Sequence, residues 1–293
     1  MKRLVRIAIV GDIHGHFDSA DLVYFDRSDD DLILFVGDLC QLVWPPQTRR
    51  VARCIAQLEK PALFIAGNHD VGNGFQLLAE LKGWRWLARL AGLRHLSHHR
   101  RLGAWLGGVP NAGHSAHPFQ INGVSFDVVV GRPYALGGSE LTFAPFMKSW
   151  FGVATLEDSA ALLMRRVDQT RSERLIFLAH NGPHGLGDRP TDIWGCDFAP
   201  ERGDWGDQDL TRAIAYARGR GKQVLAVVAG HMHQRTRQGD QRSWHVERDG
   251  THFINAAHVP RVYAQNGVRQ RHHVRLRVAA DGVAVHEVVV SGR

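Results

Sequence analysis

Apolar residues in this chain are grouped in short runs of the length of a β-strand. Near the amino terminus the runs cover residues 4–10, 32–36 and 62–66. Between them the spacing of apolar residues predicts a short helix over about 18–24 and an amphipathic helix over about 46–59. A strand, a crossover helix and a further strand form the unit of a parallel sheet. The pattern therefore predicts an α/β fold.

The rest of the chain alternates strands with helices and then ends in strands alone. Apolar runs predict strands over 124–130, 175–179, 224–229, 253–254, 268–278 and 283–290, and helical spacing predicts helices within 73–101 and over 156–170 and 207–220. The last three strands have an antiparallel pattern, with a turn at Asp281–Gly282 between the final two. Since no repeat or linker interrupts the pattern, we expect one domain over residues 1–293.

Five of the predicted strands are followed directly by residues of metal-binding types. The segments are Gly11-Asp12-Ile13-His14-Gly15, Gly37-Asp38, Gly67-Asn68-His69-Asp70, His180-Asn181 and Gly230-His231-Met232-His233. Asp12 and His14 are two residues apart, so they lie on one face of an extended backbone. Because the carboxyl ends of parallel strands meet at one edge of a sheet, we expect these segments to converge there.

Seven side chains of these segments have the chemistry of a two-metal site. They are Asp12, His14, Asp38, Asn68, His180, His231 and His233. Three oxygen ligands and four imidazoles are too many for one tetrahedral ion, and they suit two ions bridged by Asp38. The mixed donor set favours Mn, Fe or Zn over Mg. Paired ions of this kind acidify a shared water and neutralise phosphoryl oxygens, so the set predicts phosphoester hydrolysis.

The five motifs, in this order and at about this spacing, resemble those of the calcineurin-like metallophosphoesterases. The resemblance covers residues 4–258, with the strands of 268–290 beyond it. It implies a four-layer α/β/β/α sandwich. Two mixed β-sheets would lie between layers of helices, with a dinuclear metal site at the carboxyl-terminal ends of the strands.

The resemblance also implies a role for each motif residue. One metal would be held by Asp12, His14, Asp38 and His233, and the second by Asp38, Asn68, His180 and His231. A hydroxide bridging the metals would attack phosphorus, and His69 would protonate the leaving group or steady the phosphoryl oxygens. Asp70 would orient the ring of His69.

One departure from the family pattern bears on the substrate. In the phosphoprotein phosphatase branch the second motif continues to an arginine that binds phosphate. Here the chain reads Gly37-Asp38-Leu39-Cys40-Gln41, without that arginine. A phosphodiesterase or a hydrolase of small phosphomonoesters is at least as good an interpretation as a protein phosphatase. Two alternatives remain: a nuclease or nucleic-acid phosphodiesterase, and a catalytically silent protein-binding scaffold on the same fold.

Composition narrows the cellular setting and the partners. The net charge of +7 fits an anionic phosphoester substrate. Because the basic residues are scattered, nucleic acid is a partner that the charge allows but does not indicate. Three cysteines without close spacing favour a reducing compartment. No apolar run reaches the roughly 18 residues of a membrane span, so we expect a cytoplasmic protein without a membrane partner, of open oligomeric state.

Two aromatic-rich segments lie outside the motifs. Residues 181–209 are rich in Gly, Asp and Trp and begin directly after a predicted ligand. We expect either a lid over the substrate, with Trp194 or Trp205 stacking on a planar group and Arg189 meeting phosphate, or a loop packed on its own aromatics. Arg132 and Arg235 are further candidate phosphate contacts. The second segment is residues 73–101. In it we expect Trp84, Trp86, Leu87 and Leu90 to pack in the interior.

Overall fold

A computed structural model describes residues 4–280 and 282–292. Its strands are β1 (Leu4–Val10), β2 (Leu32–Phe35), β3 (Ala62–Phe64), β4 (Ser115–Ile121), β5 (Val124–Val130), β6 (Arg174–Leu178), β7 (Gln223–Ala229), β8 (His245–Arg248), β9 (Thr251–Asn255), β10 (Val262–Gln265), β11 (Val268–Ala279) and β12 (Val283–Gly292). Its helices are α1 (Ser19–Arg27), α2 (Pro45–Ile55), α3 (Gly74–Leu81), α4 (Arg85–Ala91), α5 (His95–Leu106), α6 (Ala144–Phe151), α7 (Leu156–Asp168) and α8 (Gln208–Gly219). Three short 3₁₀ turns, η1 (Asn68–Asp70), η2 (Gly92–Arg94) and η3 (Pro200–Arg202), complete the described elements.

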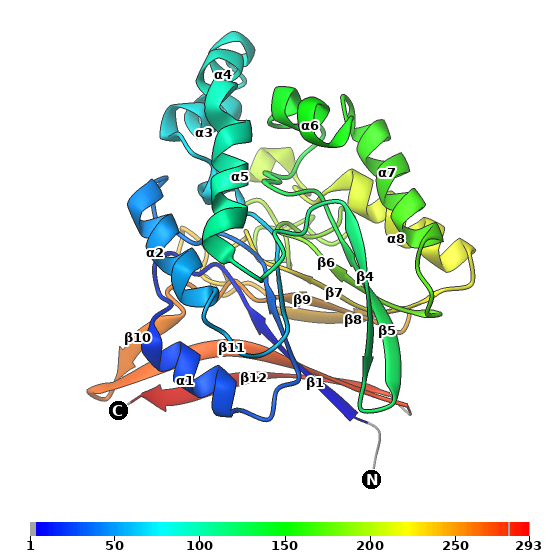
Figure 1. The fold of residues 1–293 in the computed structure, drawn as a ribbon. Helices are drawn as coiled ribbons and strands as arrows, with labels where there is room; N and C mark the ends of the chain where they lie inside the picture. Colours follow the sequence, from blue (N-terminus) through cyan, green and yellow to red (C-terminus); the bar gives the residue numbers. More distant parts are fainter. Residues whose placement is uncertain (1–3, 281, 293) are drawn as a thin grey trace.

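Two mixed sheets organise the chain (Figure 1). The first has the order β10-β11-β1-β2-β3, with β12 also paired to β11. In it β1, β2 and β3 are parallel, as the strand–helix–strand pattern predicts, and β11 is antiparallel to β1. The second has the order β4-β5-β6-β7-β9-β8, with parallel pairing from β5 to β9 and an antiparallel strand at each edge.

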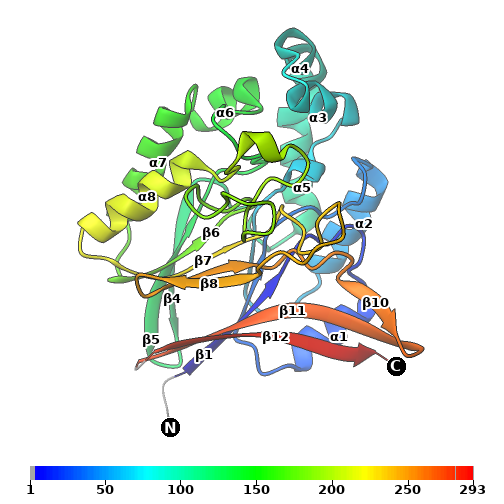
Figure 2. The same cartoon turned by 180° about the vertical axis from the view of Figure 1, so that it is seen from behind.

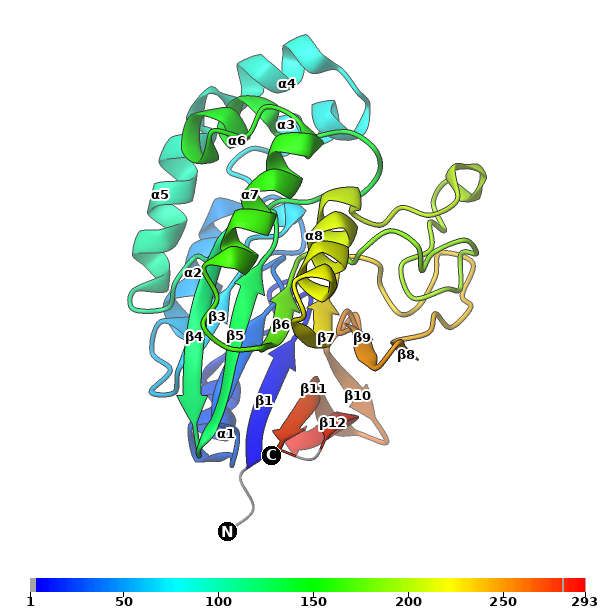
Figure 3. The same ribbon diagram turned by 90° about the vertical axis from the view of Figure 1, so that its right-hand side faces the viewer.

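The residues of β1 explain how the layers stack. Val5, Ile7 and Ile9 face the second sheet, while Ala8 and Val10 face the helical layer, so both faces of the strand are buried. Helices α2 and α5 cover the outer face of the first sheet, and α7 and α8 cover the outer face of the second (Figures 2 and 3). The expected four-layer sandwich with two mixed sheets is confirmed.

Several details differ from the sequence-based expectations. The sequence did not predict helix α6 or strands β4, β8 and β10. The three strands were missed because they are short or carry exposed polar residues. The expected strand at 253–254 lies within β9, which is parallel to β7 and antiparallel only to β8. Residue 281 of the predicted turn at Asp281–Gly282 lies outside the described residues. Among those residues no helix combines the length and hydropathy needed to cross a bilayer.

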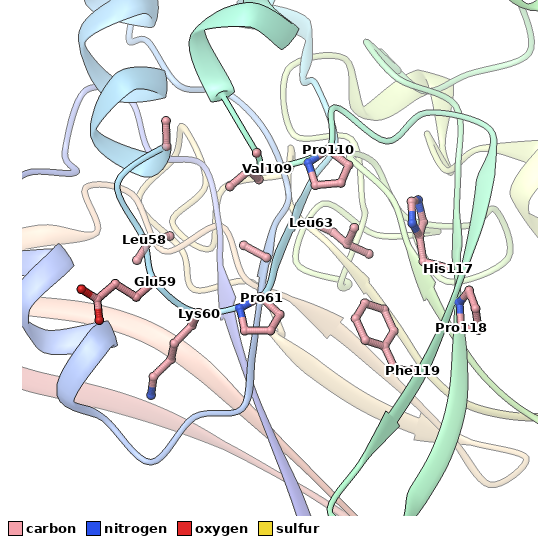
Figure 4. A pocket seen from close by; sticks show the side chains of 13 residues that line it. Leu58, Glu59, Lys60, Pro61, Leu63, Val109, Pro110, His117, Pro118 and Phe119 are labelled. Carbon is pink, nitrogen blue, oxygen red and sulfur yellow. The ribbon is translucent and has the colours of Figure 1, made fainter.

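A cavity of about 530 Å³ lies where β3 and β4 form the edges of the two sheets (Figure 4). Its lining includes Leu63, Pro110 and Phe119. The amine of Lys60 on its rim donates to the carbonyls of Ser28 and Asp30, at 2.5 and 2.7 Å. None of the predicted metal ligands lines this cavity, and its one lysine is occupied by backbone carbonyls. We therefore assign it no role in the chemistry.

Candidate metal centre

The carboxyl ends of five strands deliver the predicted ligands to one region. Residues 12 and 14 follow β1, residue 38 follows β2, and residue 68 lies in η1 after β3. Residue 180 follows β6, while residues 231 and 233 follow β7. The backbone amide of His231 donates to both carboxylate oxygens of Asp12, at 3.2 and 3.1 Å, which links the ends of the two sheets directly. The convergence predicted from the sequence is present.

The first group of ligand atoms comes from Asp12, His14 and His233. Each residue offers one ligand atom, and these atoms lie within 4.8 Å of one another. The Nε2 atoms of the two histidines are 3.1 Å apart, and His233 Nε2 is 3.5 Å from Asp12 Oδ2. The Nδ1 atom of His14 lies 3.0 Å from the carbonyl of Cys40, so Nδ1 donates and Nε2 faces the group. This arrangement can hold a metal ion.

The second group is centred on the side-chain oxygen of Asn68. That oxygen lies 2.8 Å from His180 Nε2 and 2.8 Å from His231 Nδ1. The Nδ1 atom of His180 donates to the carbonyl of Val36 at 2.6 Å, which leaves a lone pair on Nε2 of the neutral ring. Two acceptor atoms facing each other at 2.8 Å require a cation or a proton between them. The geometry therefore fits a cation site.

Asp38 lies beside the second group, and its backbone carbonyl accepts from the amide of His14, a residue of the first group, at 2.8 Å. Its Oδ1 atom is 3.6 Å from His180 Nε2 and accepts a hydrogen bond from the amide of His69 at 2.8 Å. Burial alone would raise the pKa of Asp38. Electrostatic interactions with His180, His69 and His14 outweigh this effect and hold that pKa well below its usual range. The carboxylate is therefore ionised beside ligands of both groups.

Electrostatics favour the ligand form of two of the histidines, His231 and His233. Burial, reinforced by His180, lowers the pKa of His231 to about 3, and burial lowers that of His233. Their neutral rings keep a lone pair for a metal. Burial opposes charge on His180 too, but Asp38 and Asp12 raise its pKa above the ordinary value. The centre therefore attracts positive charge at the position of His180 Nε2, which is what a bound cation would supply.

Strained backbone accompanies the ligands. Asp12, His14, Asp38 and His231 all have positive φ angles, of 24°, 43°, 54° and 68°. Non-glycine residues adopt this region at an energetic cost, and such strain concentrates at functional sites. Each of these residues follows a strand, so the turn redirects its side chain toward the centre instead of along the sheet.

Glycines beside the ligands allow the strand ends to approach closely. A Cβ atom at Gly67 would collide with Asp38 Oδ1 and with the ring of His180. A Cβ atom at Gly230 would collide with Asp12 Oδ1. The glycines in front of Asn68 and His231 are therefore required by packing around ligands from other strands, in addition to any role in their own turns.

Asp70 does not orient the ring of His69, which corrects the expectation from the sequence. Its carboxylate instead accepts from the backbone amides of Gly67, Asp38 and Leu39, at 2.9, 2.9 and 2.8 Å. Three amide donors from the strand ends thus hold this carboxylate away from the ring of His69. Burial and the nearby charge of Asp38 raise the pKa of Asp70 to about 7. Asp70 is thus a positioning residue that ties together the turns after β2 and β3.

The ring of His69 is held by packing. It lies edge-on to the ring of His14, with ring centroids 5.2 Å apart. Its buried Nδ1 has no hydrogen-bond partner among the described residues. The ring therefore sits beside the first ligand group with a nitrogen that no protein group in the described part of the chain uses.

The loop over residues 181–209 is fastened to the molecule. Trp194 is fully buried and packs on Gly182, so it cannot stack on a substrate as the lid hypothesis proposes. The indole of Trp205 donates to the carbonyl of Leu136 at 2.6 Å. One carboxylate oxygen of Asp204 accepts from three successive amides of residues 185–187. These contacts support the alternative, a loop packed on its own aromatics.

Arg132 is not a phosphate contact. Its guanidinium is buried and paired with Asp207 at 2.8 Å and Asp209 at 3.0 Å. A neutralised, fully buried arginine has no donor left for substrate. The other candidates, Arg189 and Arg235, are exposed.

Two contributors to the centre were missed in the sequence. The carbonyl of Cys40 fixes the ring of His14, but a backbone acceptor leaves no signal in residue type. The buried guanidinium of Arg242 donates to the carbonyls of His233 and Gly195, and to Asp197 at 3.1 Å. It thereby joins the last ligand to the 181–209 loop. No motif surrounds this arginine, so only its burial reveals it.

Comparison with known proteins agrees with the fold. One solved structure matches 98% of this chain and 99% of its own at 12% identity, with a TM-score of 0.51. A metallophosphoesterase from Sphaerobacter thermophilus is 14% identical over 97% of this chain and 88% of that chain, with a TM-score of 0.33. Vps29 from Chaetomium thermophilum is 9% identical over 99% of this chain and 96% of its own, with a TM-score of 0.27. Only the first of these likenesses supports the fold, and no curated protein matches the chain.

The family model for calcineurin-like phosphoesterases matches residues 5–235. This range contains all five ligand segments, and it ends two residues after His233. The match covers well over half of the chain, and the two mixed sheets and the Asp12, His14 and His233 group agree with it. The chain therefore belongs to the calcineurin-like phosphoesterase family.

Proposed function

We propose that the protein is a metal-dependent phosphoesterase that hydrolyses a phosphomonoester or a phosphodiester. The observation that carries the proposal is the presence of two groups of ligand atoms, with Asp38 in contact with a residue of each: its carboxylate lies 3.6 Å from His180 Nε2, and its carbonyl accepts from the amide of His14. One group is Asp12, His14 and His233, and the other is centred on Asn68. A single structural ion would need only one of these groups, whereas phosphoester hydrolysis uses two ions side by side.

The donor set defines which ions suit the centre. Asp12, His14 and His233 would hold one ion, Asn68, His180 and His231 the other, and Asp38 both. Carboxylate, amide and imidazole ligands together suit Mn, Fe or Zn. When bound, such ions supply Lewis-acid activation of water and of the phosphoryl group.

The residues around the ligands have their own parts in the proposed reaction. The ring of His69 stands beside the first group, and we assign it the transfer of a proton to the leaving oxygen. Cys40 holds His14 by its carbonyl, so Nε2 of that ring points at the centre. Asp70 accepts from the amides of Gly67, Asp38 and Leu39 and thereby keeps the Asp38 carboxylate in place.

The complete ligand set supports an enzyme over a silent scaffold. A scaffold does not need ionised, buried and strained ligand positions, because these destabilise the fold unless a ligand compensates. Here Asp12, Asp38 and Asn68 are all buried at the centre, and two of the three have positive φ angles. We expect the protein to bind metal and to turn over phosphoesters.

The test combines metal content with hydrolysis of two aryl esters. Purified protein loaded with Mn or Zn should bind about two ions per chain and should hydrolyse p-nitrophenyl phosphate or bis-p-nitrophenyl phosphate. Asp38→Asn should lower kcat/KM by about a thousandfold or more, because a neutral amide bridges two cations poorly. The matched control is Asp249→Asn, which changes an exposed turn residue on β8–β9 and should keep full activity.

Two results would overturn the proposed function. One is fewer than one ion per chain after loading. The other is full activity in the Asp38→Asn protein. Hydrolysis of DNA or RNA in preference to both aryl esters would instead place the substrate among nucleic acids.

A further inference from the structure

We propose that helices α3 and α4, with the turn η2, dock the protein onto an anionic lipid bilayer. This segment, residues 74–94, is called the apex here. Figures 1 and 3 show α3 and α4 projecting from one end of the molecule, far from both chain termini. The proposal does not depend on the proposed function, since none of the proposed metal ligands lies in the apex.

Large apolar side chains of the apex are exposed. The exposed fraction is 78% for Phe75, 67% for Trp86 and 77% for Leu93. Leu78, Leu81, Trp84 and Leu90 are also exposed. Exposed apolar residues scattered singly are ordinary, but seven within twenty-one residues mark a surface that binds something apolar. These residues include Trp84, Trp86 and Leu90, which we expected to pack in the interior.

The two helices turn their apolar faces outward by their periodicity. In α3, Phe75, Leu78 and Leu81 recur every three residues on the exposed face, while Leu77 and Ala79 are buried. In α4 the exposed Trp86 and Leu90 are four residues apart, and the buried residue is the small Ala88. A surface helix normally turns its apolar face to the core. Here larger apolar side chains lie outside than inside.

The charges around the apex favour an anionic occupant. Lys82, Arg85, Arg89 and Arg94 are exposed on it, and Arg100 and Arg101 follow on α5. The one acidic residue in residues 74–101 is Glu80, and its carboxyl pKa is raised by burial. Of these basic side chains, Arg85 reaches Glu140 at 3.4 Å in an exposed pair, which is weak in water. Tryptophan, phenylalanine and leucine beside lysine and arginine are the composition of helices that bind anionic membrane surfaces.

The same charges argue against a second copy of this chain as the occupant. A symmetric contact would bring two sets of basic residues together with only Glu80 and the Glu140 that pairs with Arg85 to offset them among the residues named here. A bilayer with anionic lipids accepts the apolar side chains and pairs its phosphates with the basic ones at the same time. The lack of a membrane-spanning run is no obstacle, because helices of this type lie on the surface.

The test measures binding of the full chain to vesicles by co-sedimentation. Vesicles of phosphatidylcholine with 30% phosphatidylglycerol should bind the protein at least tenfold more tightly than phosphatidylcholine alone, and added NaCl should weaken the binding. Trp86→Ser combined with Leu90→Ser should weaken it about tenfold or more. Arg89→Glu should weaken it by roughly tenfold, since two units of charge are lost.

Matched controls carry the same changes elsewhere. Val23→Ser with Val289→Ser alters two half-exposed apolar residues on α1 and β12, and Arg277→Glu makes the same charge change on β11. Neither should alter vesicle binding. The proposal is wrong if the control variants weaken vesicle binding as much as the apex variants do. It is wrong as well if the protein binds neither kind of vesicle. It is also wrong if the chain forms a dimer that Trp86→Ser with Leu90→Ser separates. Hydrolysis of a small aryl phosphate reports separately on the metal centre and should not change in any of these variants.

Discussion

The metal centre and the apex depart from the usual placement of residues in opposite ways. At the metal centre, ionisable side chains such as Asp12, Asp38 and His180 are buried at the ends of strands. At the apex, apolar side chains such as Phe75 and Trp86 are exposed on regular helices. Elsewhere in the fold, apolar residues of both sheets are buried in the layer between the two sheets. Each departure costs stability unless a ligand compensates, which is why we propose a function for each surface.

The two regions also differ in how they are held. The ligands stand on strained turns that Asp70 and the carbonyl of Cys40 pin in one arrangement. The apex is built of unstrained helices whose side chains meet solvent. A metal centre needs fixed geometry, because ligand atoms must coincide at one point. A surface that binds lipid needs only the right face, so substitutions should have sharp effects at the centre and graded effects at the apex.

The largest effect of a substitution is expected at His69, beside the metal centre. His69→Ala should lower kcat for aryl phosphoesters by about 100- to 10,000-fold, the range for loss of a general acid. Metal content should stay the same, since the ring is not among the proposed ligands. Steady-state kinetics over a series of leaving groups measures this, and the loss should be smallest for the most acidic leaving group. His286→Ala on β12 is the matched control. Equal activity in the His69→Ala and His286→Ala proteins would remove the proton-transfer role.

A smaller effect is expected where close packing supports the ligands. Gly67→Ala places a Cβ against Asp38 Oδ1 and the ring of His180, so the ligands of both groups must shift. Metal affinity should fall by about 100-fold, the upper end for changes beside a ligand. Calorimetric titration with Mn or Zn measures it. Unchanged metal affinity would mean that the turns at the centre can shift without cost, which contradicts a fixed geometry there.

Two buried histidines of α5, His98 and His99, should make the stability of the fold depend on pH. Burial lowers the pKa of His98 and of His99 to about 4. These rings stay neutral in the folded chain while the unfolded chain takes up protons below pH 6.5. Stability is therefore full above pH 6.5 and is lost as pH falls toward 4. Each ring should cost about 2 kcal/mol of the free energy of unfolding between pH 7 and pH 5.

Urea unfolding of chelator-treated protein at the two pH values measures this loss without interference from metal release. His99→Phe tests the contribution of one ring to this loss, because it keeps an aromatic ring beside Tyr134 that cannot take up a proton. Its fall in stability between pH 7 and pH 5 should be smaller by about 2 kcal/mol. An equal fall in both proteins would mean that His99 accepts protons in the folded state.

The regular parts of the fold and the convergence of the ligands could be predicted from the sequence. Continuous apolar runs specify strands buried on both faces, and a polar residue directly after such a run has few places to go except the sheet edge. The family resemblance supplied the second sheet and the helical layers. Strands with mixed faces, such as β4 and β8, could not be found, because their side chains alternate without a clear apolar period.

Contacts between distant residues could not be predicted. Asp70 was assigned to the neighbouring ring of His69, but its carboxylate accepts instead from one amide of its own turn and two of the turn after β2. Arg132 was expected to meet phosphate, but Asp207 and Asp209, more than seventy residues away, neutralise it. The apex was expected in the interior because apolar periodicity shows which residues share a face but does not show whether another element covers that face.

The smallest expected effect tests whether α5 behaves as an ordinary helix, in contrast to the strained turns. Gly103 lies inside α5, where an added Cβ meets nothing within 4 Å and φ is not positive. Gly103→Ala should stabilise the protein by about 0.5–1 kcal/mol, because alanine loses less backbone entropy on forming a helix. Urea unfolding at pH 7 measures the gain. Gly67→Ala in the same assay should destabilise, so two identical substitutions should have opposite signs. Destabilisation by Gly103→Ala would mean that this face of α5 is covered in solution, which would extend the docking surface from the apex down the helix.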